Sequence, residues 1–104
     1  MKTITICGSQ KFKNEITDAA LKTELAGNNV LIPIFPLDDS YQFNKEKTEI
    51  LQKMHKERIK MSDAILVVDI DGYIGSTTKN EIDFARSLNK EIIYLSDILG
   101  EDKK

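Results

Sequence analysis

The segment from residue 64 to residue 85 contains the side chains with the clearest chemical potential. It reads AILVVDIDGYIGSTTKNEIDFA: an apolar run, a loop with glycines at 72 and 75, then apolar residues at helical spacing. A strand, a glycine-containing loop and a helix N-terminus together present free backbone N–H groups and a dipole that favours an anion. Glu81 falls about one turn inside this helix. The segment therefore combines a potential phosphate or sugar site, around Gly75, Ser76 and Thr77, with a carboxylate.

Glu81 has two interpretations of similar weight. Thr78-Lys79-Asn80-Glu81 matches a capping box, in which Glu81 would bond back to the backbone N–H of Thr78. Alternatively, Glu81 is a nucleophile that attacks the anomeric carbon of a sugar and forms a covalent ester. Such a site also needs an acid for the leaving base, and Asp69 and Asp71 are the nearest candidates in the sequence.

The two aspartates also have ordinary interpretations, because Asp is common at strand ends and in turns. Nothing else in their loop completes a hard-oxygen metal site, so we expect no metal ion there. Tyr73, between the two glycines, is either a platform for a nucleobase or an anchor that packs the loop onto the protein.

A second glycine-containing loop, Gly8 to Phe12, follows the first predicted strand, KTITIC, in which β-branched residues alternate. Phe12 is included among the candidate ligand-binding residues. Gly8 could let the backbone approach a ligand and Ser9 could donate a hydroxyl to a sugar or phosphate, or the loop could be an ordinary turn. We interpret Cys7 as a core residue, because no base lies near it in sequence. His55 is interpreted as a partly buried or surface residue.

These loops are positioned by a regular alternation of predicted elements. Pro33 lies within the second predicted strand and indicates an edge strand or an early exit from the sheet. On the long second helix we expect Phe43, Ile50, Met54 and Met61 to form the apolar stripe, with Leu51 and Ile59 beside it. The predicted strands cover residues 2–7, 30–35, 65–68 and 91–95, and the predicted helices cover residues 13–26, 43–61 and a segment that includes residues 82–88, followed by a short polar tail.

The alternation βαβαβαβ predicts a single α/β domain over residues 1–104, with a parallel sheet covered by helices on both faces. The expected strand order is 2-1-3-4. Ligands bind outside the carboxyl ends of such strands, where the strand order switches. The switch lies between strands one and three, so the Gly8–Phe12 and Asp69–Thr77 loops should meet there.

Composition narrows the possible partners. The chain has 104 residues, a net charge of −2, interspersed lysines and acids, one cysteine and one histidine. No basic patch indicates a nucleic acid polymer, no apolar run is long enough to cross a bilayer, and no Cys/His cluster indicates zinc. The first predicted strand leaves no room for a signal peptide, and a single cysteine is typical of a reducing compartment, so we expect a cytoplasmic protein.

Three segments resemble the nucleoside 2-deoxyribosyltransferase superfamily, which includes nucleotide N-glycosidases that hydrolyse deoxynucleoside monophosphates. They are ICGSQKF at residues 6–12, HKERIKMSDAILVVDIDGYIGSTTKNEIDFA at residues 55–85 and NKEIIYL at residues 89–95. The resemblance extends over nearly the whole chain and is closest to short bacterial and phage members. It implies a flavodoxin-like Rossmannoid fold.

The resemblance also implies residue roles. The catalytic glutamate of the superfamily falls on Glu81, its small-residue ligand loop on Gly75 and Ser76, and its first-strand ligand loop on Cys7, Gly8 and Ser9. The sequence departs from the superfamily pattern at two positions. Transferases usually have an aspartate where Gly75 stands, and an aspartate of the second helix would fall near His55.

The sequence therefore predicts an enzyme that cleaves or transfers the N-glycosidic bond of a deoxynucleoside or its monophosphate, with no cofactor. The alternatives are a nucleotide-binding or sensing module without chemistry, and a structural subunit of a larger assembly. We expect a homodimer or higher oligomer, because a sheet of this size buries little apolar area and the resembling proteins build sites across subunits. The long second helix or the third helix is expected at the interface.

Overall fold

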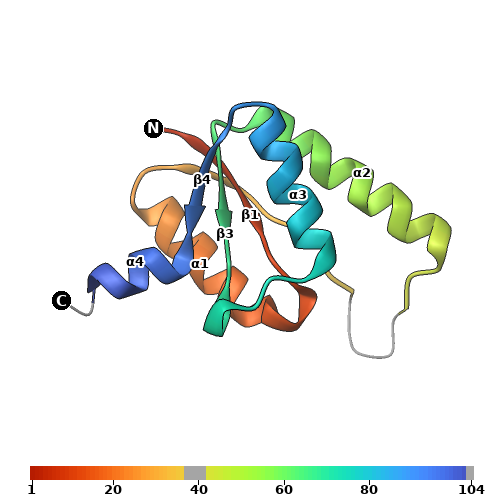
Figure 1. The fold of residues 1–104 in the computed structure, drawn as a ribbon, viewed down its shortest axis with the longest axis horizontal. Coiled ribbons are helices and arrows are strands. Elements are labelled where there is room, and N and C mark those ends of the chain that lie inside the picture. Colours follow the sequence, from red (N-terminus) through yellow and green to blue (C-terminus); the bar gives the residue numbers. More distant parts are fainter. Residues whose placement is uncertain (37–41, 103–104) are drawn as a thin grey trace.

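The computed structural model describes residues 1–36 and 42–102, with side chains described up to residue 98 (Figure 1). The elements alternate along the chain as the sequence predicts, and two short 3-10 turns, Gln10–Phe12 and Ile70–Gly72, lie in the loops after the first and third strands. The strands are β1 (Thr3–Cys7), β2 (Asn29–Leu31), β3 (Ala64–Val67) and β4 (Glu91–Tyr94), and the helices are α1 (Lys13–Leu25), α2 (Lys45–Met61), α3 (Ser76–Ser87) and α4 (Leu95–Asp102).

The four strands form one parallel sheet in the order β2-β1-β3-β4, which confirms the predicted fold class and strand order. The register aligns the ends of the two central strands, because Cys7 of β1 pairs with Val67 of β3. The loops that follow these two strands therefore leave the same edge of the sheet, at the switch in strand order.

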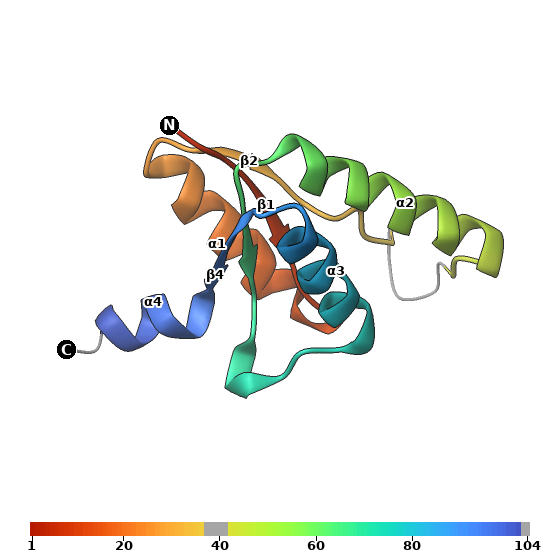
Figure 2. The same cartoon turned by 45° about the horizontal axis from the view of Figure 1, so that its top comes forward.

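Helices cover both faces of the sheet, which gives three layers (Figures 1 and 2). Alternate residues of β1 and β3 face opposite sides, because side chains alternate across a strand. Ile6 and Leu66 pack with Ile16 of α1 on one face. Cys7 and Val67 pack on the other face, in a cluster that also contains Ile59 of α2 and Ile82 and Ala85 of α3. Within the described part of the chain, no helix is long and apolar enough to cross a membrane.

Strand β2 is shorter than the sequence predicts. It is an edge strand and ends at Leu31, two residues before Pro33. Proline cannot donate a ladder hydrogen bond, so the chain leaves the sheet there, as the position of Pro33 indicates. The Asp- and Ser-rich sequence of residues 36–42 predicts a loop, and most of it, residues 37–41, lies outside the described residues.

The predicted apolar stripe of the second helix is wrong. Ile50, Met54 and Met61 are exposed, by 53%, 42% and 72% of their surface, whereas the buried residues of α2 are His55 and Ile59. The helix is rotated so that Leu51, His55 and Ile59 face the rest of the protein. His55 therefore points inward, and an apolar face of α2 remains exposed.

Candidate functional site

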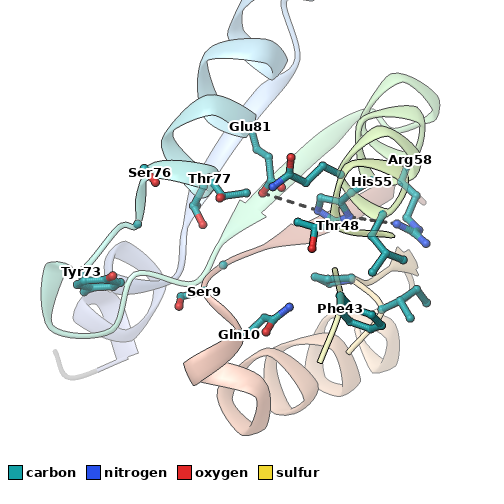
Figure 3. Close-up of a pocket in the computed structure, with 17 residues that line it drawn as sticks. Ser9, Gln10, Phe43, Thr48, His55, Arg58, Tyr73, Ser76, Thr77 and Glu81 are labelled. Atoms are coloured by element: carbon teal, nitrogen blue, oxygen red, sulfur yellow. Dashed lines mark hydrogen bonds and ion pairs between the residues drawn. The ribbon is translucent and has the colours of Figure 1, made fainter. Parts of the chain in front are cut away.

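A cavity of about 420 Å³ lies at the carboxyl ends of β1 and β3, between the loops that follow them and helices α2 and α3 (Figure 3). Its position is the one expected for a ligand site in an open parallel sheet. Six of the predicted ligand-binding residues line it, namely Gly8, Ser9, Tyr73, Gly75, Ser76 and Thr77. The two loops that the strand order was expected to bring together do meet here.

Glu81 lines the cavity from α3 and is only 8% exposed (Figure 3). The capping-box interpretation is wrong, because α3 begins at Ser76 with Gly75 as its N-cap, and Thr78 lies inside the helix. One further turn along the helix, the Glu81 carboxyl points to the cavity. Burial raises its pKa from 4.5 to about 7, although the Cys7 thiol and the Lys56 charge favour the ionised form.

Two other buried side chains lie against Glu81. The Nε2 atom of His55 lies 3.9 Å from Oε1 of Glu81 and 3.6 Å from Sγ of Cys7. The Sγ, Nε2 and carboxylate oxygen atoms all lie within 4.8 Å of one another. Cys7 ends β1, His55 lies in the middle of α2 and Glu81 lies in α3. Three elements far apart in the sequence thus bring a thiol, an imidazole and a carboxyl together below the cavity.

His55 is neutral at physiological pH and its orientation is fixed by Arg58. Burial, and to a lesser extent the nearby Arg58 charge, lower the pKa of His55 from 6.5 to about 4, whereas a hydrogen bond with the backbone of Ile6 acts in the opposite direction. The NH1 atom of Arg58 lies 3.3 Å from Nδ1 of His55. A guanidinium can only donate, so Nδ1 accepts and Nε2 carries the proton. The Nε2–H group then points toward Cys7 and Glu81.

Gly8 has a structural role as well as a place in the cavity wall. A Cβ atom on Gly8 would lie 3.2 Å from both Cδ1 of Ile16 and Cβ of Val68. These atoms belong to the packed core between α1 and the sheet, where little relaxation is available. Glycine at this position therefore permits close packing beside the cavity.

Tyr73 lines the cavity and also anchors its loop. Nζ of Lys11 lies 3.3 Å from the centroid of the Tyr73 ring, and Phe12 contacts the same ring edge to face at 5.8 Å between centroids. Phe12 itself is not among the residues that line the cavity. Both interpretations of Tyr73 are therefore compatible with its position, because its ring lines the cavity and also packs against Lys11 and Phe12.

The structure does not bring the two predicted assisting acids into the cavity. Asp69 is buried and accepts hydrogen bonds from the backbone N–H and the hydroxyl of Ser96, at 2.9 and 2.7 Å. Its carboxylate therefore fastens the start of α4 to the end of β3. Asp71 is exposed, with a positive φ of 53° in the 3-10 turn. Their role as acids stays a prediction.

Sequence reasoning missed the contribution of α2 to the site. Thr48, Leu51, Gln52, His55 and Arg58 all line the cavity. Their spacing of three or four residues places them on one helical face, which is a signal present in the sequence. The apolar residues on the neighbouring face form an equally regular stripe, and this stripe conceals the signal.

The fold has a counterpart of known structure. It matches the structure of the 2-desoxiribosyltransferase from Leishmania mexicana with a TM-score of 0.60 and 20% sequence identity. The match covers 90% of this chain and 63% of the other chain. No protein-family model matches the sequence, and no characterised protein matches it significantly.

The protein therefore has the α/β fold of a 2-deoxyribosyltransferase, as the resemblance implies. The chain spans less than two thirds of the length of that neighbour. At 20% identity the likeness concerns the fold alone.

Proposed function

We propose that this protein cleaves or transfers the N-glycosidic bond of a deoxynucleoside or deoxynucleoside monophosphate, with Glu81 as the nucleophile. The observation that carries the proposal is a buried glutamate at the wall of a 420 Å³ cavity, at the switch point of the sheet. The name of the structural neighbour, a 2-deoxyribosyltransferase, agrees with this reaction class.

The chemical steps follow those of a retaining glycosidase. An oxygen of ionised Glu81 attacks C1′ of the deoxyribose, and the C1′–N bond breaks as the base departs with the bonding electrons and takes a proton from solvent water. The product is a glycosyl ester on Glu81. Water then hydrolyses the ester, or a second base attacks C1′ and regenerates a nucleoside.

Ser9 and the first turn of α3 support binding of the sugar or phosphate. Ser9 and Ser76 both line the cavity, and the N-cap Gly75 makes no side-chain capping bond. The first backbone N–H groups of α3 are therefore available to an anion or a hydroxyl, and the helix dipole favours negative charge there. Arg58 adds a positive charge to the opposite wall (Figure 3).

The ionisation of Glu81 suits a nucleophile near neutral pH. With a pKa of about 7, roughly half of the Glu81 side chains carry a charge at pH 7. A buried carboxylate is poorly hydrated, so little water must be removed before it attacks. The neutral Nε2–H group of His55 is directed toward this carboxylate, whose Oε1 atom lies 3.9 Å from Nε2.

The test is release of free base from a panel of deoxynucleosides and deoxynucleoside monophosphates, measured by chromatography. Glu81→Gln removes the charge and keeps the shape, so base release should fall by orders of magnitude. Asp83→Asn is the matched control, because Asp83 lies two residues further along α3 with an exposed side chain. It should retain the activity of the original protein. Equal base release from Glu81→Gln and the original protein would exclude Glu81 as the nucleophile.

A second candidate function is nucleotide binding without turnover. It is favoured by one observation: within the described part of the chain, Glu81 is the only carboxylate that lines the cavity. A retaining pair needs a second carboxyl at about 5–5.5 Å. Calorimetric titration with the same panel separates the two candidates, since a binding module takes up ligand but never releases free base.

We also propose that the protein forms a homodimer or higher oligomer through α2. The apolar face of α2 formed by Ile50, Met54 and Met61 is exposed in the single chain. A run of exposed large apolar side chains on one helix is typical of an interface. α2 also carries His55 and Arg58, so such an interface would lie on the helix that forms one wall of the cavity.

A further inference from the structure

The cluster of Cys7, His55 and Glu81 has the composition of a metal site as well as of a catalytic one. We propose that these three residues bind a divalent cation that accepts sulfur and nitrogen ligands, such as Zn²⁺. Each residue offers one ligand atom, and the atoms lie within 4.8 Å of one another. The proposal concerns binding by these side chains and does not depend on the glycosidic reaction.

Two of the three distances between the ligand atoms are close to those around a tetrahedral zinc ion. Zinc binds sulfur at about 2.3 Å, and imidazole nitrogen and carboxylate oxygen at about 2.0–2.2 Å. Tetrahedral angles then place the ligand atoms about 3.4–3.6 Å apart. Sγ of Cys7 lies 3.6 Å from Nε2 of His55, which lies 3.9 Å from Oε1 of Glu81. Sγ of Cys7 and the carboxylate oxygen of Glu81 lie within 4.8 Å of each other, so the Glu81 carboxylate moves inward to complete the three-ligand set.

The charges of the three residues also suit a dication. A thiolate from Cys7 and a carboxylate from Glu81 together neutralise two positive charges, and neutral His55 adds none. A buried charge is tolerated when it is compensated or bound to a metal. The sulfur and imidazole donors select zinc and its neighbours in the transition series over magnesium and calcium, which prefer oxygen ligands.

The cavity provides the entry path and the fourth ligand position. His55 and Glu81 both line the cavity, with side chains that are 6% and 11% exposed, whereas Cys7 is fully buried beneath them. An ion arriving from the cavity meets the carboxylate and imidazole first and the thiol last. The side facing the cavity stays open to water or a ligand, as in three-ligand zinc sites.

Arg58 should weaken binding of the metal ion, and replacing it gives a second test of the proposal. Its NH1 atom donates to Nδ1 of His55, which leaves the proton on Nε2, the atom that must bind the metal. Metal binding moves this proton to Nδ1, where an acceptor is normally required. Arg58→Gln removes a positive charge and supplies an amide oxygen that can accept from Nδ1–H. This variant should bind zinc more tightly, by about tenfold.

Titration with Co²⁺ tests the site directly, because cobalt substitutes for zinc and its absorption reports its ligands. The protein is prepared without an affinity tag and freed of metal with a chelator. The chain contains one cysteine and one histidine, so a thiolate-to-cobalt charge-transfer band can come only from Cys7. We expect this band to saturate at one equivalent and to disappear when Zn²⁺ displaces the cobalt. A shift of the single imidazole resonance on Zn²⁺ addition would identify His55.

Variants separate this site from adventitious binding on exposed carboxylates. Cys7→Ser should lose the charge-transfer band and weaken zinc binding by about 100-fold or more, whereas Asp83→Asn should change neither. The measurement on the original protein stands alone if a variant fails to fold. Absence of the thiolate band at saturating Co²⁺, or equal zinc affinity of Cys7→Ser and the original protein, would overturn the proposal.

Discussion

The buried pair of Glu81 and His55 leads to a prediction about stability and pH that is independent of any ligand. Burial moves the two pKa values in opposite directions, to about 7 for Glu81 and to about 4 for His55. Each pKa lies about 2.5 units from its ordinary value, and one pKa unit corresponds to about 1.4 kcal/mol. Each side chain therefore changes the free energy of unfolding by about 3 kcal/mol over the pH range between its two pKa values.

The two contributions have opposite signs. The folded state binds the Glu81 proton more tightly than the unfolded state, so this contribution is present below pH 4.5 and lost as the pH rises to about 7. The folded state resists protonation of His55, so this contribution is lost as the pH falls from 6.5 to about 4. Between pH 4.5 and pH 6.5 the two contributions change with pH in opposite directions, so they cancel in the free energy of unfolding of the unmodified protein.

Single variants should separate the pH dependence that each side chain gives to the free energy of unfolding. Relative to the unmodified protein, Glu81→Gln should gain about 3 kcal/mol of unfolding free energy between pH 4.5 and pH 7. His55→Gln should lose about 3 kcal/mol, relative to the unmodified protein, between pH 4 and pH 6.5. Burial is the principal cause of both shifts, and the lesser contributions come from Arg58 and Ile6 for His55 and from Cys7 and Lys56 for Glu81. Neither shift depends on the other side chain, so replacing one with glutamine should leave the other shift in place.

The assay is urea unfolding at half-unit pH intervals from about 4 to about 8, with a chelator present so that no metal ion binds the cluster. Asp83→Asn is the control, because its exposed side chain should leave the pH dependence unchanged. Parallel curves for Glu81→Gln and the unmodified protein would refute the reasoning, because Glu81 would then titrate alike in the folded and unfolded states.

Three further predictions concern residues around the site. Asp69→Ala should cost about 1–3 kcal/mol of unfolding free energy by releasing Ser96 and the start of α4; a loss of base release by orders of magnitude, without such destabilisation, would instead identify Asp69 as the assisting acid. Gly8→Ala should destabilise the fold by about 1–3 kcal/mol in thermal or urea unfolding, because its methyl group would press on Ile16 and Val68. Light scattering at micromolar concentration should show a dimer or larger species that Met54→Glu dissociates, and a monomeric unmodified protein would contradict the proposed α2 interface.

The sheet could be predicted from the sequence because its signals are local. β3 is a short apolar run between polar residues, β1 is a run of alternating β-branched residues, and the alternation of strands and helices leaves few possible topologies. The early end of β2 follows from one residue, Pro33. The strand order then brought the Gly8 and Gly75 loops together, so this half of the cavity was predictable.

The α2 side of the cavity could not be predicted because the sequence offered two helical faces of similar regularity. Ile50, Met54 and Met61 outweighed Leu51, His55 and Ile59 in hydrophobicity, yet the second face is the one that packs inward. The cluster below the cavity was also hidden, since Cys7 and His55 are 48 residues apart. Only the packing of α2 against the sheet brings the imidazole to the thiol.

The same two pKa values limit how the cluster can act in catalysis. A reaction with ionised Glu81 as nucleophile and protonated His55 as acid needs a pH above about 7 for one group and below about 4 for the other. Even at the best intermediate pH, only about one molecule in a thousand would hold both groups in the required forms. His55 is therefore better suited to donating a hydrogen bond from neutral Nε2–H than to protonating a leaving base. Bases that depart without an acid from this cluster should be the better substrates, and turnover should follow the ionisation of Glu81 alone.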